Sequence, residues 1–531
     1  MSINRFSAPL SRRSFLVAAS AAAATSCVGL PRNDPASVGA RRKAAWRKRP
    51  LVLDDDGDLV YADQTRQGPE AFLSLRMEDC LAAGVDSLAW CMMWAIAQKG
   101  QTRVRYWQAQ LENVPFQENL PDPTSVVAEF CRKHGIEVFG SIRMNDAHDA
   151  FGLPFPKLVY PLKVKHPEML LGDESQRGVV GDGLAAASWS GMDFAHEKVR
   201  NDRLWWIEHT AGRYGMDGVD LNFFRMPFYF KPGEEESNAP LMTDMIRQGR
   251  KRIDAISRKL GRPVLLGVRV PGTIDACQRI GLDIETWLRE GLIDRMLTGG
   301  GYVCYSTPAE ELIQLGHRFD VPVYPCINCP ASYTLGGNSL RAAASNFWAV
   351  GADGIYLWNF QYIPAPGALG YGRPTQAQYT TQLPEIADPK RLKYLDKSFA
   401  VNVSVWEQYQ RASEMPPLPV SLGGRQDGNA QVIPVRVGDD IAAANRAGKV
   451  RDVVLRLQTA GSVRGDVLSV TLNDAPVLQA EAGGDGQVAA PLHPDAFRQG
   501  VNRLTLQLAK RAPSATREIL VEGARVDVRY Q

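Results

Sequence analysis

Polar side chains that can exchange protons recur in this chain at the ends of short apolar runs. The most informative case is the segment Met216-Asp-Gly-Val-Asp-Leu-Asn-Phe-Phe-Arg-Met-Pro227. Side chains of a strand alternate between its two faces, so Asp220 and Asn222 share the face opposite Val219 and Leu221. Burying a carboxylate without partners is costly. We therefore expect Asp220 to lie at a hydrated strand end, where it can act as an acid or base; a structural, hydrogen-bonded aspartate is the alternative.

Similar polar groups follow other apolar runs. Two carboxyls at one rim can act as an acid–base pair, arginines hold hydroxyls or carboxylates, and aromatic rings offer flat stacking faces. On this basis we predict Asp220 and Asp146 as the catalytic pair. The predicted substrate-binding residues are Arg143, Asn145, His148, Asn222, Arg269, Trp90, Trp358 and Asn359. The two arginines could instead pair with carboxylates inside the protein, and each aromatic ring could belong to the core.

The elements that must position these residues alternate between β-rich runs and helical stretches from about residue 50 to 412. The predicted strands are Leu51–Asp55, Val85–Met92, Glu137–Met144, Gly218–Phe224, Val264–Val270, Ile293–Leu297, Val321–Cys326 and Gly354–Phe360. Eight such β-then-α units predict a (β/α)8 barrel over residues 50–415, whose strand ends meet at one catalytic rim. A doubly wound open sheet is the alternative, but no GxGxxG motif follows the first strand.

The pattern of apolar and polar residues changes after Pro416-Pro417. Alternating apolar runs separated by turn signals, such as Val467–Leu472 and Ala524–Tyr530, predict an antiparallel β-sandwich over residues 416–531. Such a domain beside a barrel is either a carbohydrate-binding module or a structural cap, and both remain open.

The N-terminal residues resemble an export signal. Arg12-Arg13 precedes a short apolar run, as in twin-arginine signals, and Ala24-Thr25-Ser26-Cys27 resembles a lipobox with Cys27 as the lipidated residue. Residues 1–27 are therefore predicted as the signal and residues 28–49 as a basic, flexible linker. The expected location is the periplasm or outer envelope, with a lipid anchor as the one link to a membrane.

Charge argues against nucleic acid as a partner. The first 49 residues hold ten of the 61 Lys and Arg but one of the 58 Asp and Glu, which leaves the rest with a net charge of −6. We expect neither a cofactor nor a metal, because the Asp54–Asp58 cluster lacks the rest of a calcium loop. The spacing of Cys326 and Cys329 indicates a local disulfide or simple packing rather than a zinc or redox site.

The chain resembles secreted bacterial glycoside hydrolase-like barrels. Asp217-Gly-Val-Asp-Leu-Asn222 with Arg225 is similar to their fourth strand, and Trp287-Leu-Arg-Glu-Gly-Leu-Ile-Asp294 is similar to the segment before their sixth. The group that it resembles most is the glycosyl hydrolase-like family 10 group, over most of residues 50–362. Two departures matter: Asn222 and Phe224 stand where chitinase-type barrels carry acids, and the seventh strand ends without a glutamate.

The resemblance and the carboxylates together predict an exported glycoside hydrolase that acts on a poly- or oligosaccharide. Two other functions remain open: a non-catalytic carbohydrate-binding lipoprotein on a degenerate barrel, and a metal-assisted hydrolase or lyase that uses the Asp54–Asp58 cluster. The oligomeric state is not indicated by the sequence.

Overall fold

The computed structural model describes most of the barrel and the C-terminal domain. It describes residues 34–57, 68–75, 77–92, 123–151, 160–176, 187–300, 307–329, 336–363, 374–403, 407–423, 430–473, 475, 478–483 and 485–531, and the backbone of 95–96 and 105–106. The predicted signal at residues 1–27, with Cys27, lies outside the described residues. No helix among the described residues is long and apolar enough to cross a membrane.

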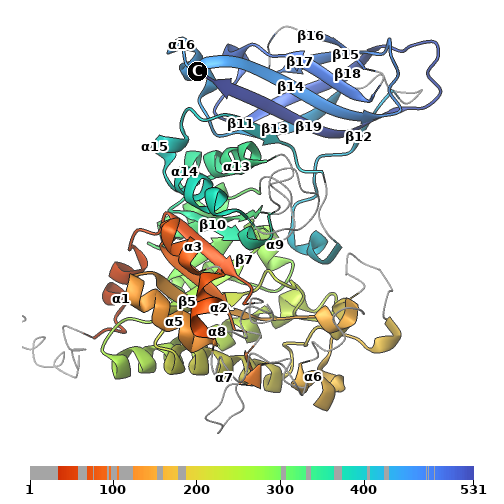
Figure 1. Cartoon of the computed structure of the whole chain (residues 1–531). Helices are drawn as coiled ribbons and strands as arrows, with labels where there is room; N and C mark the ends of the chain where they lie inside the picture. The colour runs from red at the N-terminus through yellow and green to blue at the C-terminus, as the bar shows by residue number, and fades with distance from the viewer. Residues whose placement is uncertain are drawn as a thin grey trace, which may run out of the picture.

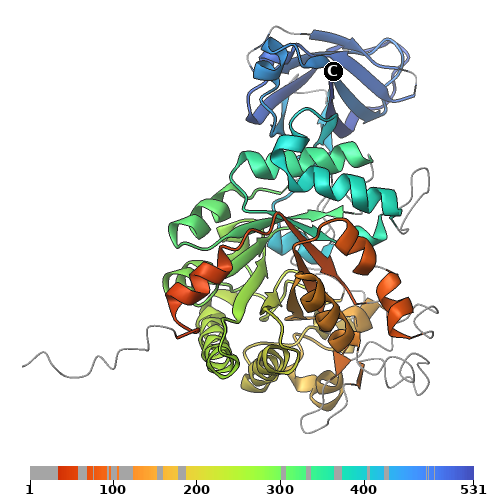
Figure 2. The same ribbon diagram turned by 60° about the vertical axis from the view of Figure 1, so that its left-hand side comes forward.

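Eight parallel strands close into a barrel, which confirms the predicted fold class (Figures 1 and 2). In chain order they are β1 (Leu51–Asp55), β2 (Ser87–Cys91), β5 (Glu137–Arg143), β6 (Gly218–Asn222), β7 (Leu265–Val270), β8 (Arg295–Thr298), β9 (Val323–Asn328) and β10 (Ile355–Trp358). The barrel closes where β1 pairs with β10, with Leu51 opposite Ile355. A two-stranded ribbon, β3 (Ala95–Ile96) with β4 (Arg105–Tyr106), follows β2.

Helices surround the barrel and cover the apolar outer faces of its strands (Figure 2). Those that lie between successive barrel strands from β2 to β10 include α5 (Pro123–His134), α7 (Glu197–Arg213), α8 (Glu235–Leu260), α10 (Ile284–Arg289), α11 (Glu310–Arg318) and α13 (Gly337–Ala349). Two short helices, α2 (Pro69–Ser74) and α3 (Met77–Ala82), lie between β1 and β2. The strands are buried on both faces, so each is rich in apolar residues.

Residues 34–49 belong to the barrel, which corrects the prediction that all of 28–49 is a flexible linker. They form α1 (Val38–Ala45), which begins at the N-cap Ser37. Arg41 forms an ion pair with Asp294, and the fully buried Arg49 pairs with Glu137 at the start of β5. The basic residues that suggested a tether are therefore ion-pair partners at the amino end of the barrel strands.

The C-terminal domain is a β-sandwich of two antiparallel sheets, as predicted, and sits at one end of the molecule (Figure 1). One sheet holds β11 (Lys397–Ala400), β12 (Val420–Leu422), β14 (Val450–Ala460), β17 (Gln487–Pro491) and β19 (Ile519–Tyr530). The other holds β13 (Gln431–Val437), β15 (Val467–Leu472), β16 (Leu478–Glu481) and β18 (Gly500–Lys510). Because β11 pairs with β19, the sandwich takes in a strand that precedes the predicted boundary at 416.

Between β11 and β12 the chain returns to the barrel as a 3-10 helix, η11 (Glu407–Ala412). The two domains are also joined by a buried polar cluster. Lys397 donates to Asp439 at 2.9 Å, and Asp439 accepts from Ser345 of α13 as well. The sandwich is therefore attached to the barrel by specific hydrogen bonds and not by the chain alone.

Candidate active site

Asp54 lies near the end of β1 and faces the barrel interior, and its pKa is raised. The carboxyl is 2% exposed and accepts a hydrogen bond from Tyr356 of β10 at 2.6 Å. Burial, together with the charge of Asp56, raises the pKa of Asp54 to about 7. Its Oδ1 has no hydrogen-bond partner among the described residues. Asp54 therefore holds a proton near neutral pH on a carboxyl with one free oxygen, as a general acid requires.

Asp56, two residues further along, is the ionised counterpart. Burial opposes ionisation, but the neighbouring guanidinium groups of Arg143 and Arg225 outweigh it and hold the pKa of Asp56 below its ordinary value. Arg143 donates to Asp56 Oδ1 at 2.7 Å and to Asp146 Oδ2 at 3.1 Å. The Asp56 side chain is 15% exposed. Two carboxyls with separated pKa values thus lie beside each other at the carboxyl end of the barrel.

Asp146 and His148 form the next part of this network. Asp146 Oδ1 lies 2.7 Å from Nδ1 of His148, and Nε2 of His148 lies 2.6 Å from Nη2 of Arg225. Because an arginine can only donate, Nε2 accepts and Nδ1 carries the proton toward Asp146. Despite its burial, Asp146 has a pKa well below its ordinary value because of His148 and Arg143. A carboxylate with both oxygens engaged and so low a pKa is a weak base, so Asp146 orients its neighbours.

Arg269 and Trp358 stack inside the barrel. The guanidinium carbon lies 4.2 Å from the centre of the Trp358 ring and 5.3 Å from that of Tyr356. Arg225 approaches Trp358 as well, at 5.7 Å. Tyr409 of η11 packs edge-on against Trp358 at 6.5 Å and exchanges hydrogen bonds with Arg225. A residue from the segment between two sandwich strands therefore covers the aromatic part of the site.

Asp220 does not lie at a hydrated strand end, so that prediction is wrong. It is 1% exposed, and both of its oxygens accept from Arg295 at the start of β8, with Nε at 3.0 Å. The same guanidinium lies over the Phe139 ring and donates to Ser87 at 3.3 Å. Asp220 is thus half of an ion pair buried deep in the barrel, and the predicted catalytic pair of Asp220 with Asp146 loses its basis.

Two predicted substrate-binding residues have structural contacts instead. Trp90 points out of the barrel, where its indole donates to Thr124 at 3.2 Å and packs edge-on against Phe72. Asn145 is fully buried and donates to the carbonyls of Met192 and Phe228 at 2.9 and 2.7 Å. Trp90 joins a strand to helices and Asn145 joins two loops, so neither is available to a sugar.

Asn222 and Asn359 lie at strand ends, as expected, and both are almost completely buried. Asn222 accepts from the backbone of Phe224 at 3.1 Å, which shapes the turn after β6. Asn359 adopts a left-handed backbone conformation with φ of 60° directly after β10. The described contacts of Asn222 and Asn359 do not show whether either residue binds substrate.

The sequence did not point to Tyr356 or Tyr409. Arg225 was noted only as part of the fourth-strand resemblance, and Asp54 and Asp56 were noted as acids at a strand end but were not chosen as the catalytic pair. Strand parity could have found Tyr356, since it lies two residues before Trp358 on the same face. Tyr409 carries no local signal, because it reaches the site from a distant part of the chain.

Metal binding finds no support among the described residues, where no group of three or more His, Cys, Asp or Glu side chains is placed to hold an ion. Asp58 lies outside them. Cys326 and Cys329 are both free and buried, so the local disulfide that their spacing suggested is not formed. Cys326 instead packs beside Arg269, with Sγ 3.7 Å from Nη2.

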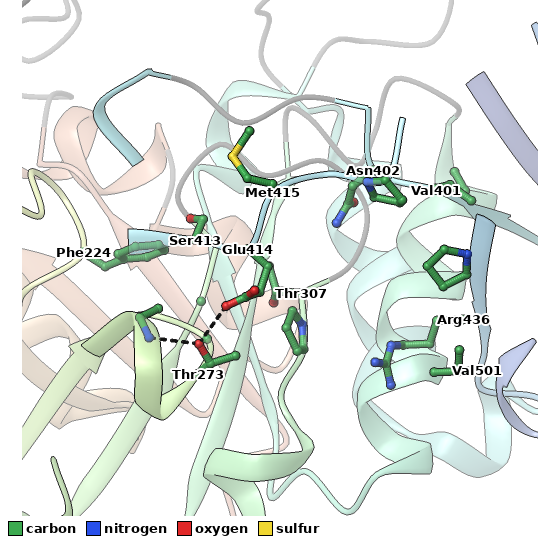
Figure 3. Close-up of a pocket in the computed structure, with 17 residues that line it drawn as sticks. Phe224, Thr273, Thr307, Val401, Asn402, Ser413, Glu414, Met415, Arg436 and Val501 are labelled. Atoms are coloured by element: carbon green, nitrogen blue, oxygen red, sulfur yellow. Dashed lines mark hydrogen bonds between the residues drawn. The ribbon is translucent and has the colours of Figure 1, made fainter. Parts of the chain in front are cut away.

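A cavity of about 180 Å³ adjoins this site between the barrel and the sandwich (Figure 3). Phe224 lines it from the barrel, and Val401 and Arg436 line it from the sandwich side. Thr273 donates to Glu414 across one wall at 3.1 Å. Phe224 also packs against Tyr409 at 5.3 Å, so one layer of side chains connects the cavity to Trp358.

No protein-family model and no curated protein sequence matches this chain. Solved structures resemble it in fold. A maltogenic α-amylase from Thermotoga neapolitana is 12% identical with a TM-score of 0.38, over 87% of this chain and 99% of the amylase. A GH36 α-galactosidase from Geobacillus stearothermophilus is 12% identical with a TM-score of 0.35, over 89% of this chain and 59% of its own.

An α-L-fucosidase from Paenibacillus thiaminolyticus is 14% identical with a TM-score of 0.41, over 64% of this chain and 49% of the fucosidase. The barrel itself is established by its strand pairing, and its chemistry has to be argued from the residues at its carboxyl end.

Proposed function

We propose that this protein is a glycoside hydrolase whose acid is Asp54 and whose second carboxylate is Asp56. The observation that carries the proposal is the pair of unlike carboxyls at the end of β1: Asp54 is buried with its pKa raised to about 7, and Asp56 is ion-paired with Arg143 at 2.7 Å with its pKa lowered. Enzymes that cleave glycosidic bonds commonly need this division of roles.

In the proposed reaction Asp54 donates its proton to the oxygen of the leaving sugar as the bond to the anomeric carbon breaks. Asp56 supplies the electron pair, either by attacking that carbon directly or by taking a proton from an attacking water. Two residues along an extended segment place Cα atoms about 6.5–7 Å apart. The separation of the two carboxyl groups decides between these routes, since it is shorter in retaining than in inverting enzymes.

Turnover of a panel of aryl glycosides and oligosaccharides tests the proposal. Asp54→Asn and Asp56→Asn should each lower kcat by about 10²-fold or more, the usual scale for acid–base groups. Asp55→Asn is the matched control, because Asp55 lies between them on the opposite face of the strand. Equal activity in all three variants and the parent protein would reject the assignment.

A second candidate function is carbohydrate binding without catalysis. It is favoured by Asn222 and Phe224, which occupy positions that carry acids in chitinase-type barrels, and by the near-complete burial of Asp54. Sugar binding without turnover of any substrate in the panel would support this function over hydrolysis.

We also propose that the protein is exported through a twin-arginine signal and is lipidated at Cys27. Changing Arg12 and Arg13 to lysine should retain the precursor in the cytoplasm, and Cys27→Ser should release the mature protein from the membrane fraction. Normal export of the first variant would indicate the general secretory route, and an unchanged membrane fraction for the second would exclude the anchor.

A further inference from the structure

Arg269 has hydrogen-bond donors that no described residue uses. The side chain is 0% exposed, and its Nε and Nη1 have no hydrogen-bond partner among the described residues. Its contacts are the Trp358 and Tyr356 rings and a long contact to the Cys326 sulfur. A buried guanidinium is costly unless its donors and its charge are satisfied. Stacking on two rings holds it in place without using its planar donor edges.

The charges around Arg269 are not balanced within the described part of the site. Three guanidinium groups, those of Arg143, Arg225 and Arg269, lie near two ionised carboxylates, those of Asp56 and Asp146. The pKa of Asp54 of about 7 leaves that group largely neutral in mildly acidic solution. The pKa of His148 is lowered, chiefly by burial, so the imidazole adds little charge. Below about pH 7 these described groups therefore carry one net positive charge.

A second unpartnered polar group lies on the neighbouring strand. Asn328 of β9 is 1% exposed, and neither its amide oxygen nor its amide nitrogen has a partner in the described residues. It shares a strand face with Cys326, which contacts Arg269, and it is paired in register with Trp358. An amide in this position can accept from one sugar hydroxyl and donate to another.

We propose that the substrate is an acidic sugar, with its ring carboxylate bound by Arg269 and adjacent hydroxyls bound by Asn328. A planar guanidinium matches a carboxylate in a way that it does not match a lone hydroxyl. This inference rests on the proposed function for its location, but it concerns binding and can be measured without turnover.

The test measures binding by calorimetry in the Asp56→Asn background, with D-glucuronate and D-galacturonate as probes. The controls are glucose, galactose and the methyl esters of the two acids. We expect the free acids to bind at least 10-fold more tightly than the uncharged sugars. Arg269→Gln should abolish that preference by lowering affinity for the acids by about 10- to 100-fold, the range for hydrogen bonds to a charged group.

Asn328→Asp provides a second variant of nearly unchanged size. A carboxylate at this position should repel the acids and compete with them for Arg269, so the preference for the acids over glucose and galactose should disappear, since charge is the main change. Thermal denaturation of each variant shows whether it is folded, and Asn328→Asp keeps the test valid if Arg269→Gln does not fold.

The outcomes separate this inference from the proposed function. Equal affinity for acids, esters and neutral sugars would overturn the acidic-sugar inference, even if the protein hydrolyses neutral glycosides. Tight binding of uronates, together with a parent protein that hydrolyses no glycoside in the panel, aryl uronides included, would support the inference and reject hydrolysis.

Discussion

Replacing Asp54 by asparagine tests the proton on the candidate acid by its effect on stability as well as on activity. The side chain is 2% exposed and accepts from Tyr356, and an asparagine can keep that hydrogen bond. The amide cannot ionise, so the variant differs from the parent mainly in the cost of burying a negative charge. The free-energy cost of burying this charge depends on pH, whereas the effect of altered packing does not.

The magnitude follows from the shift in pKa, from an ordinary value of 3.8 to about 7. Three pKa units correspond to about 4 kcal/mol. Because the pKa is raised by folding, the parent suffers no penalty below about pH 4. The penalty grows as pH rises toward 7 and is constant above it. Asp54→Asn should therefore gain stability relative to the parent across this window, by up to about 4 kcal/mol.

The assay is denaturant unfolding of both proteins at intervals from pH 4 to pH 9, with the difference in unfolding free energy plotted against pH. Asp55→Asn serves again as the control for a substitution in the same strand. A difference that stays flat from pH 4 to pH 9 would refute a raised pKa at Asp54. The catalytic counterpart is a fall in kcat/KM above pH 7, where the acid loses its proton.

Three other substitutions test the remaining assignments. Asp220→Asn leaves the Arg295 charge buried without its counter-ion, so the thermal midpoint should fall by the equivalent of about 3–5 kcal/mol with unchanged turnover per folded molecule; lost turnover at an unchanged midpoint would return Asp220 to catalysis. Lys397→Met leaves the Asp439 carboxylate without its cation, and limited proteolysis between the domains should become faster; an unchanged rate would mean that the cluster does not attach the sandwich. Trp90→Phe should cost about 1–3 kcal/mol of stability and leave sugar affinity unaltered, whereas weakened sugar binding would place this ring in the site.

The barrel strands could be predicted because each is an apolar run bounded by turn residues and followed by a helical pattern. The predicted strand Leu51–Asp55 coincides with β1, and the predicted strand Glu137–Met144 extends one residue beyond β5. The linker at 34–49 was misjudged because its basic residues are matched by carboxylates far along the chain. Asp294, for example, is the partner of Arg41.

The site was harder to predict, because the alternation of side chains along a strand shows which face a residue occupies but not how deep in the barrel it lies. Asp220 does face the barrel interior, but its partner Arg295 sits at the start of β8, so the pair lies below the rim. Trp90 lies between Ala89 and Cys91 in β2. The alternation of side chains along this strand alone would have placed the Trp90 ring on the outer face of the barrel. The pKa of Asp54 depends on burial and on charges from other strands, which no local pattern in the sequence encodes.

The return of η11 to the barrel affects the order in which the parts of the molecule can fold. Both β11 and β12 pair with β19, so the loop that carries Tyr409 over Trp358 is anchored at each end by the same strand. During synthesis the covering residue leaves the ribosome well before the strand that fixes its anchors. A nascent barrel can close its eight strands early, but its mouth stays unfinished until β19 arrives. The mouth of the barrel should therefore be completed only after β19 has been made, and exchanging the sandwich for another domain should remove the anchors of the residue that covers Trp358.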